Sequence, residues 1–148
     1  MKSIFLTLCI VLSFQLLSAQ TKKSVHHKVV SKTTVSPALK ASIDAGKVIY
    51  TQNCLTCHQA DGYGVQNMNP PLIKTSYVLG DKTRLIGILL NGLSHQEIDG
   101  NPYQNVMPSQ SFLTDKQMAD VLTYVRNSFG NKASAITEAE VKTIKAKK

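Results

Sequence analysis

The stretch Cys54-Leu55-Thr56-Cys57-His58 constrains the fold more strongly than any other part of this 148-residue chain. Two cysteines stand three positions apart, and a histidine follows the second one directly. Cysteine pairs at this spacing occur in redox-active dithiols, in zinc sites and at covalent attachment points for haem. Each of these sites requires a different setting, so the rest of the sequence must distinguish them.

The zinc and dithiol interpretations both lack the setting that they require. A structural zinc site takes about four nitrogen or sulfur ligands, usually from two separate pairs. The chain has no second cysteine pair, and its other histidines are His26, His27 and His95. We expect His26 and His27 to be tail residues, because they fall in a polar, basic stretch. A thioredoxin-type dithiol lies beside a strand in a βαβ unit, and no reliable strand pattern is present.

The third interpretation agrees with the motif. Cys-x-x-Cys-His is the attachment signature of c-type haem, in which two thiolates add to the two vinyl groups of the porphyrin. The histidine after the second cysteine is then placed to ligate the iron. The sequence therefore predicts one covalently bound haem c at Cys54, Cys57 and His58.

A methionine is a common sixth ligand in electron-transfer haems, and it raises the reduction potential. Met118 falls on the apolar stripe of a predicted helix, so we expect it to pack in the core. Met68 follows His58 too closely to reach the opposite haem face easily. Met107 stands in a predicted loop 49 positions after His58 and is the expected distal ligand. His95 is the alternative, and it would lower the potential.

The first twenty residues have the layout of a secretory signal peptide. One lysine precedes an apolar run at residues 4–17, which is shorter than the roughly 20 residues of a membrane span. We predict cleavage after Ala19 or Gln20, with an uncleaved membrane anchor as the alternative. Cys9 would be removed with this segment. Export agrees with haem, because attachment of this kind takes place outside the cytoplasm.

The net charge of +8 resides outside the central part of the chain. Residues 41–130 hold six basic and seven acidic side chains, for a net charge of −1, whereas residues 21–40 contribute +5 and residues 131–148 contribute +3. A nucleic-acid-binding domain carries its basic charge on a folded face, so no nucleic-acid partner is expected. We predict a flexible basic linker at residues 21–36, and solvated tails or tails attracted to an anionic membrane surface.

Hydrophobic spacing and capping residues predict two helices in the first part of the folded region. The first begins with Ser36 as N-cap and Pro37 in its first turn, and it runs into the cysteine motif. A middle helix covers residues 81–92, and Gly92 is a plausible stop.

Two capping boxes predict the remaining helices. The last core helix begins at Thr114 and Gln117 and should close at Gly130. Thr137 and Glu140 predict a short, exposed helix near the C-terminus. The predicted organisation is a signal peptide at 1–20, a linker at 21–36, a haem-binding domain at 37–131 and a C-terminal extension at 132–148.

Over about residues 41–130, the chain resembles the class I cytochromes c. The resemblance rests on GKVIYTQNCLTCHQADGYG (46–64), NPPL (69–72), NGL (91–93), IDGNPYQNVMPS (98–109) and LTDKQMADVLTYVRNSFGN (113–131). The last two stretches are also similar to cytochrome c modules associated with bacterial periplasmic dehydrogenases and reductases.

The resemblance implies an all-α, small class I cytochrome c fold wrapped around one covalently attached haem. By the same resemblance, Cys54 and Cys57 form the thioethers, His58 is the proximal ligand and Met107 is the distal ligand. These expectations agree with those drawn from the residues themselves.

Three further contacts are implied by the resemblance. Gly46 and Tyr124 should meet where the first and last core helices cross. The carbonyl of Pro70 or Pro71 should orient the proximal imidazole. Arg84 could stand near a haem propionate or could simply be a solvated residue on the helix surface.

The expected function is one-electron transfer in the periplasm by a protein that is not itself an enzyme. The expected partners are redox proteins such as a periplasmic dehydrogenase, a reductase or a terminal oxidase. Membrane contact is expected only through the basic tails or an uncleaved signal. Two alternatives stay open: a haem subunit of a dehydrogenase or reductase complex, and an open-site haem protein that binds small ligands or reduces peroxide if Met107 does not ligate.

Overall fold

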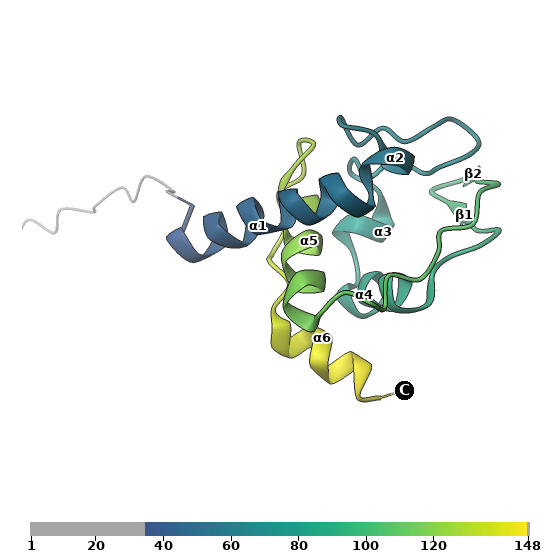
Figure 1. The fold of residues 1–148 in the computed structure, drawn as a ribbon. Coiled ribbons are helices and arrows are strands. Elements are labelled where there is room, and N and C mark those ends of the chain that lie inside the picture. The colour runs from purple at the N-terminus through teal and green to yellow at the C-terminus, as the bar shows by residue number, and fades with distance from the viewer. Residues whose placement is uncertain (1–34, 148) are drawn as a thin grey trace, which may run out of the picture. The chain divides into compact units, whose positions relative to one another are not determined.

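The computed structural model describes residues 35–147. The predicted signal peptide and residues 21–34 of the predicted linker lie outside the described residues. The all-α class is confirmed, because the only strands of the described part are two residues long. The elements are α1 (Pro37–Asn53), α2 (Leu55–His58), α3 (Ser76–Leu79), α4 (Lys82–Asn91), β1 (Glu97–Ile98), β2 (Asn101–Pro102), α5 (Asp115–Asn127) and α6 (Glu138–Lys145) (Figure 1).

Helices α1 and α5 cross at close range and make the most extensive contact between helices in the described part of the chain (Figure 1). As predicted, α1 begins at Ser36, whose side chain accepts a hydrogen bond from the backbone N–H of Leu39 at 3.2 Å. At the crossing, a Cβ on Gly46 would lie 2.0 Å from the carbonyl oxygen of Asp120 and 2.7 Å from Cβ of Tyr124. The expected contact between Gly46 and Tyr124 is therefore confirmed, and only glycine allows the approach.

The ends of α4 and α5 agree with their sequence signals in all but one place. Gly92 ends α4 with φ 78°, and the capping box of Thr114 and Gln117 begins α5. The prediction that Gly130 closes α5 is wrong, because the helix ends at Asn127 with Ser128 as its C-cap. The chain then turns sharply through three more residues, and the carbonyl of Ser128 accepts a backbone bond at 2.8 Å from the end of that turn.

Helix α6 begins at the predicted capping box and packs against α4 and α5. The expectation of an exposed helix is wrong on one side, because Val141 is fully buried and joins Ile136 in the main core. Two ion pairs reinforce the packing: Lys82 with Glu140 at 2.8 Å, and Lys145 with Asp115 at 3.0 Å.

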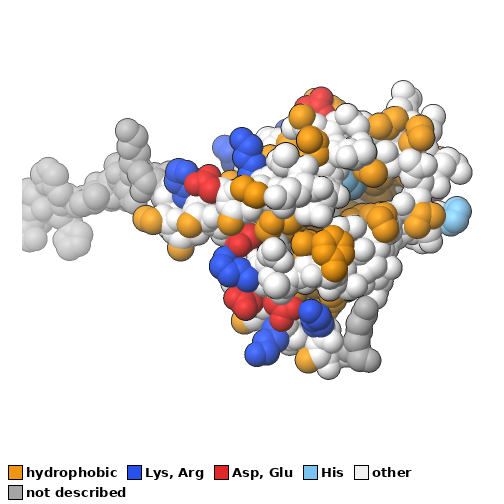
Figure 2. All heavy atoms as spheres, viewed as in Figure 1, with side chains coloured by type: hydrophobic (Ala, Val, Ile, Leu, Met, Phe, Trp, Pro, Cys, Tyr) orange, Lys and Arg blue, Asp and Glu red, His pale blue; other side chains and the backbone are white. Residues whose placement is uncertain are grey.

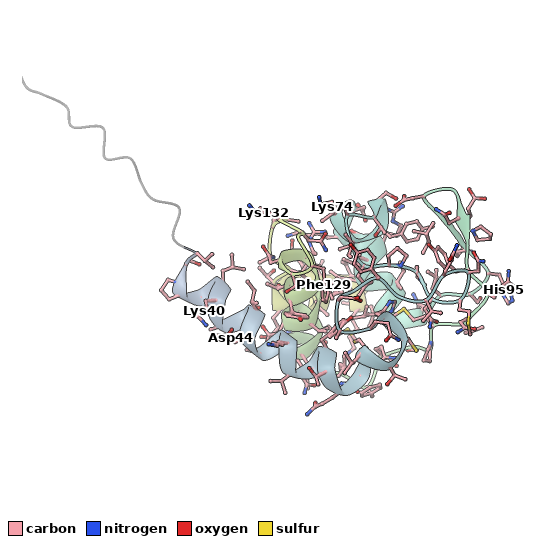
Figure 3. All side chains as sticks on the ribbon, turned by 90° about the horizontal axis from the view of Figure 1, so that it is seen from above. Lys40, Asp44, Lys74, His95, Phe129 and Lys132 are labelled. Atoms are coloured by element: carbon pink, nitrogen blue, oxygen red, sulfur yellow. The ribbon has the colours of Figure 1, made fainter. Side chains whose placement is uncertain are left out.

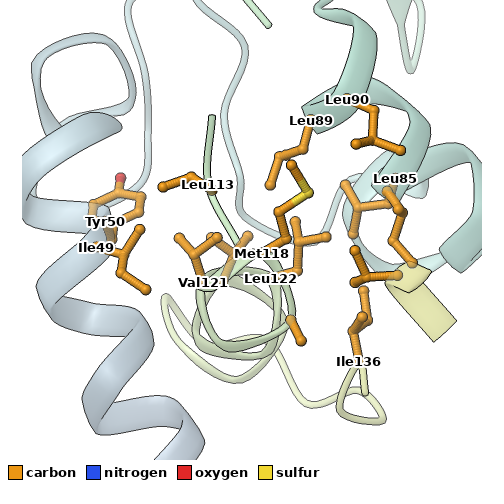
Figure 4. Close-up of a cluster of buried hydrophobic side chains, with 14 of the residues drawn as sticks. Ile49, Tyr50, Leu85, Leu89, Leu90, Leu113, Met118, Val121, Leu122 and Ile136 are labelled. Carbon is orange, nitrogen blue, oxygen red and sulfur yellow. The ribbon is translucent and has the colours of Figure 1, made fainter. Parts of the chain in front are cut away.

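The core lies between α1, α4 and α5 (Figure 4). Burial of aliphatic side chains from all three helices drives this packing. Met118 is fully buried there, as predicted from its place on the apolar stripe. The buried side chains labelled in Figure 4 are Ile49, Tyr50, Leu85, Leu89, Leu90, Leu113, Met118, Val121, Leu122 and Ile136.

Candidate functional site

A deep cleft opens beside this core, and the space in it and over its mouth, open solvent included, is about 1080 Å³. Cys54, Cys57, His58 and Met107 all line the cleft. None of the lining residues is Asp, Glu, Lys or Arg. A large apolar cofactor could therefore fill the cleft without burying a charged side chain.

The cysteine motif is positioned by a break between two helices. Cys54 ends α1, where its N–H donates to the carbonyl of Tyr50 at 2.9 Å, and it also begins the single turn of α2. Its own carbonyl accepts from the N–H of His58 at 2.9 Å. The turn brings Cys54, Cys57 and His58 to the same cleft, with Cys54 half-buried and Cys57 exposed as free thiols.

The His58 ring is buried and held by one strong contact. Its Nδ1 lies 3.0 Å from the carbonyl oxygen of Pro70. Because a carbonyl can only accept, Nδ1 carries the proton and Nε2 keeps its lone pair. Burial lowers the pKa of His58, although the bond to Pro70 partly opposes this. The imidazole is therefore neutral at neutral pH and suited to binding a metal. The expected proline carbonyl is confirmed, and it belongs to Pro70.

Met107 is fixed on another wall of the same cleft. Its N–H donates to the carbonyl of Leu93 at 2.8 Å, and the N–H of Leu93 donates back to its carbonyl at 3.0 Å. Gly92 makes this bridge feasible, because a Cβ there would lie 2.5 Å from the carbonyl oxygen of Met107. The end of α4 thus sets the position of the Met107 backbone.

The other candidate ligands of the described chain do not line the cleft. Met118 is in the core, and Met68 has 47% of its surface exposed. His95 points outward, at the end of the molecule opposite to Lys40 and Asp44 (Figure 3). Met107 is therefore the only one of these residues that shares the cleft with His58.

The Cys54 thiol does not have the lowered pKa expected of the nucleophile of a redox-active pair. Burial, with a smaller contribution from Cys57, raises the pKa of the Cys54 thiol from 9.0 to about 11. Catalytic dithiols show the opposite shift, because the thiolate is the nucleophile.

Within residues 35–147, no three side chains of His, Cys, Asp or Glu gather into a metal-binding group.

Two loops close the cleft by bonding to each other. The N–H groups of Gln104 and Asn105 donate to the carbonyls of Asn67 and Met68, both at 3.1 Å. The Asn105 side chain also donates to Asn69 Oδ1 at 3.0 Å. These contacts connect the loop that holds Pro70 to the loop that holds Met107. Sequence reasoning missed them, because polar loop residues carry no periodic signal.

The short hairpin of β1 and β2 adds another wall. Ile98 is buried and lines the cleft, and Asp99 accepts a bond from the N–H of Ser76 at 2.9 Å. Arg84 does not line the cleft. Its guanidinium donates to the Ser76 carbonyl at 2.7 Å and lies 4.1 Å from the centroid of the Tyr77 ring. The alternative of a helix-surface arginine agrees with this placement.

These residues fit a covalently attached haem. A neutral imidazole and a methionine thioether would supply the two ligands of a c-type iron, and the two thiols would form the covalent bonds to the porphyrin. They surround an uncharged, largely apolar cleft that would exclude water from a porphyrin. Figure 2 shows the hollow on the side of the molecule that carries few charged side chains, whereas Lys, Arg, Asp and Glu gather over α1, α5 and α6.

Comparison with known proteins identifies the family. Residues 43–129 match the family model described as cytochrome c. Cytochrome c-552 of Thermus thermophilus is 36% identical over 113 residues, which cover 70% of this chain and 86% of that protein. No helix among residues 35–147 combines the length and the apolar character needed to cross a membrane.

Other relatives are larger proteins. The cytochrome c subunit of the quinone-dependent alcohol dehydrogenase from Gluconobacter oxydans is 35% identical over 98 residues, which cover 65% of this chain and 20% of that subunit. The gluconate 2-dehydrogenase cytochrome c subunit of Pantoea cypripedii is 32% identical over 133 residues, covering 82% of this chain and 30% of the subunit. The chain thus spans about a fifth to a third of these two relatives.

Proposed function

The chain belongs to the cytochrome c family of electron-transfer haem proteins, and from this premise we propose that it is a periplasmic carrier with one haem c. Cys54 and Cys57 provide the two thioethers, and His58 and Met107 are the axial ligands. The observation that carries this proposal is that the four residues line one uncharged cleft, although Met107 stands 49 positions after His58.

When bound, the haem supplies a one-electron Fe(III)/Fe(II) couple. The protein's part is to hold the ligands still and to keep water away. Pro70 fixes the ring of His58, and the bridge to Leu93 fixes the backbone of Met107. Fixed ligands limit the structural change that accompanies each electron. Apolar walls disfavour the more highly charged ferric state, so they raise the potential.

The surface around the cleft suits a weakly charged partner. Residues 51–60, 62–73 and 100–114 contain no Asp, Glu, Lys or Arg, and each stretch contributes lining residues. Apolar side chains are exposed in two of them: Met68, Val106 and Phe112 are 47%, 61% and 68% exposed. A redox protein with an uncharged patch would dock here through a small interface, as is usual for electron-transfer encounters.

Dehydrogenases are the best-supported donors, because several relatives are named as cytochrome subunits of such enzymes. The same observation favours a second candidate, in which this chain is a permanent haem subunit of a dehydrogenase complex. Purification from the native cells separates the two. A free carrier elutes alone, whereas a subunit elutes with the dehydrogenase activity.

Export to the periplasm rests on the sequence of residues 1–20, and membrane contact would use only the basic tails or an uncleaved signal. The mass of the protein recovered from the periplasmic fraction tests this. Removal of the first 19 or 20 residues is expected. A full-length protein in the membrane fraction would instead mean that the segment is an anchor.

The haem attachment itself is tested by Cys57→Ala. This variant should lose stable holoprotein, because one of the two thioether bonds cannot form. Cys9→Ala is the matched control, since Cys9 lies in the predicted signal peptide and should not affect haem loading. Recovery of Cys57→Ala with a full complement of covalent haem would contradict the two-thioether site.

A further inference from the structure

We propose that Asn131 is a positioning residue for His58: it holds residues 70–74 in place, and this segment carries the carbonyl that orients the imidazole. The inference rests on the proposed function, in which His58 ligates the haem iron. Asn131 touches neither the cleft nor His58. It acts through the backbone that lies between them.

The side chain of Asn131 makes three hydrogen bonds, two to a distant segment and one to helix α5. It is only 3% exposed. Its Oδ1 accepts from the N–H of Lys74 at 2.8 Å, and its Nδ2 donates to the carbonyls of Leu72 and Val125, both at 2.8 Å. Both amide protons are used, and water has almost no access to compete. Asn131 thereby joins the end of α5 to a segment that lies 57 to 59 positions earlier in the chain.

Residues 70–74 depend on hydrogen bonds from other parts of the chain, because the segment begins with two prolines. Pro70 and Pro71 have no N–H groups, so they cannot anchor themselves by donating hydrogen bonds. Leu72 donates to the Gly62 carbonyl at 2.8 Å, and Asn131 provides the contacts that follow. Lys74 has φ 53°, in the left-handed region that lysine rarely adopts. The bond from its N–H to Asn131 helps to hold that conformation.

The two prolines also transmit position along the segment. Each ring locks φ, so the backbone between Leu72 and the Pro70 carbonyl has fewer rotations with which to absorb a shift at Leu72. That carbonyl is the hydrogen-bond partner of His58 Nδ1 at 3.0 Å. The chain of contacts therefore runs from Asn131 to Leu72, then through the prolines to His58.

The turn that carries Asn131 is held by a backbone hydrogen bond and by aromatic packing. Its N–H donates to the carbonyl of Ser128 at 2.8 Å. Between them, the ring of Phe129 packs so closely on Gly62 that a Cβ there would lie 2.6 Å from the ring. The same ring lies 5.4 Å from Tyr50 and 5.6 Å from Tyr124, between ring centroids. The turn after α5 thus braces the loop that follows the cysteine motif.

The test measures how often the bond between His58 and Pro70 opens. In reduced holoprotein labelled with ¹⁵N-histidine, exchange of the His58 Nδ1 proton with solvent requires this opening. Asn131→Ala loses all three side-chain bonds and is expected to exchange at least about tenfold faster than the unaltered protein, since loss of even one buried hydrogen bond has an effect of this order. Asn127→Ala is the matched control, because Asn127 bonds only to Thr123 in its own helix, at 3.0 Å, and its exchange should stay unchanged.

A second variant guards against a folding failure. Asn131→Asp keeps the side-chain volume and the acceptor for Lys74, but it loses both bonds donated by Nδ2. It should also exchange faster than the control. Equal exchange in the control and in whichever Asn131 variant folds would overturn the proposal. Failure of the proposed function is distinguishable, because the unaltered protein would then show no covalent haem spectrum at all.

Discussion

In the proposed site, the coordination of the iron depends most on Met107. Replacing it by alanine removes the thioether, so Met107→Ala should lower the reduction potential by on the order of 0.1 V or more. It should also open a position that binds carbon monoxide. A potentiometric titration followed by visible absorption measures both effects.

Met68→Ala is the control for that change, because Met68 is half-exposed and does not line the cleft. Its spectrum and potential should match those of the unaltered protein. An unchanged spectrum and potential in Met107→Ala would remove Met107 from the site, and His95 would then be tested next.

Gly46 is the residue that allows α1 and α5 to cross. In Gly46→Ala the new methyl group would meet the Asp120 carbonyl at 2.0 Å, so the helices must separate. We expect a loss of about 3 kcal/mol or more in the free energy of unfolding. Denaturant unfolding of the holoprotein measures it.

Gly87→Ala provides the comparison for Gly46→Ala. Gly87 lies within α4, and an added Cβ meets nothing within 4 Å. This substitution should be neutral or stabilise by up to about 1 kcal/mol, through helix propensity alone. Equal stabilities for the two variants would mean that the crossing tolerates a side chain.

At the scale of elements, the docking of α6 should depend on pH. The hydrogen bond from Lys82, followed by bonds from Thr137, lowers the pKa of Glu140 below its usual 4.5. A carboxyl group with a lowered pKa stabilises the folded state above its unfolded pKa, and this contribution is lost as the pH falls through the folded value. The α6 helix should therefore loosen below pH 4.5.

Hydrogen exchange of the α6 amides, expressed as protection relative to the free chain, measures this loosening. Glu140→Gln should reduce protection at neutral pH by up to about fivefold, because the ion pair is partly exposed. The exposed Glu138, in the same first turn, gives the control Glu138→Gln. Equal protection in the two variants would show that the contact with Lys82 does not hold the helix.

The helices could be predicted from the sequence because their signals are local. Ser36, Thr114 and Thr137 each cap a helix through a residue three positions later. The burial of Val141 and the early end of α5 could not be predicted, since both depend on contacts between elements. The contacts of Asn131 are of the same kind: two of its three side-chain partners, Leu72 and Lys74, lie more than fifty positions away, and an asparagine after a glycine predicts only a turn.

The four site residues could also be proposed from the sequence, for two different reasons. Cys54, Cys57 and His58 form a local motif whose chemistry is specific. Met107 is expected from its place in a loop 49 positions after His58 and from the exclusion of Met68 and Met118, and the structure adds that it shares the cleft with His58. The loop contacts that close the cleft, and the hairpin that supplies Ile98, required the folded chain.

Across the whole molecule, the charged side chains that the structure describes lie outside the lining of the cleft. Electron self-exchange between two copies requires the two cleft mouths to meet, and those mouths are formed by uncharged stretches. Salt screens charges that lie farther apart than a Debye length, so it has little to act on at an uncharged contact. The rate of electron self-exchange should therefore change by less than about threefold between about 0.05 and 0.5 M salt. Line broadening in NMR spectra of mixed oxidation states measures it.

Val106→Lys supplies the contrast for self-exchange. It places a cation on each of the two facing surfaces, so exchange should become slow at low salt and recover at high salt. A steep salt dependence in the unaltered protein would instead mean that charged side chains, such as those of the basic tails, lie at the exchange surface.

In the proposed site, one covalently held haem is ligated by His58 and Met107 and has no open position. Visible absorption of the exported, purified protein, oxidised and reduced, with and without carbon monoxide, tests this coordination. We predict a c-type spectrum, a methionine–iron charge-transfer band in the far red and no response to carbon monoxide. A c-type spectrum that shifts with carbon monoxide would contradict the claim and support an open-site haem protein instead.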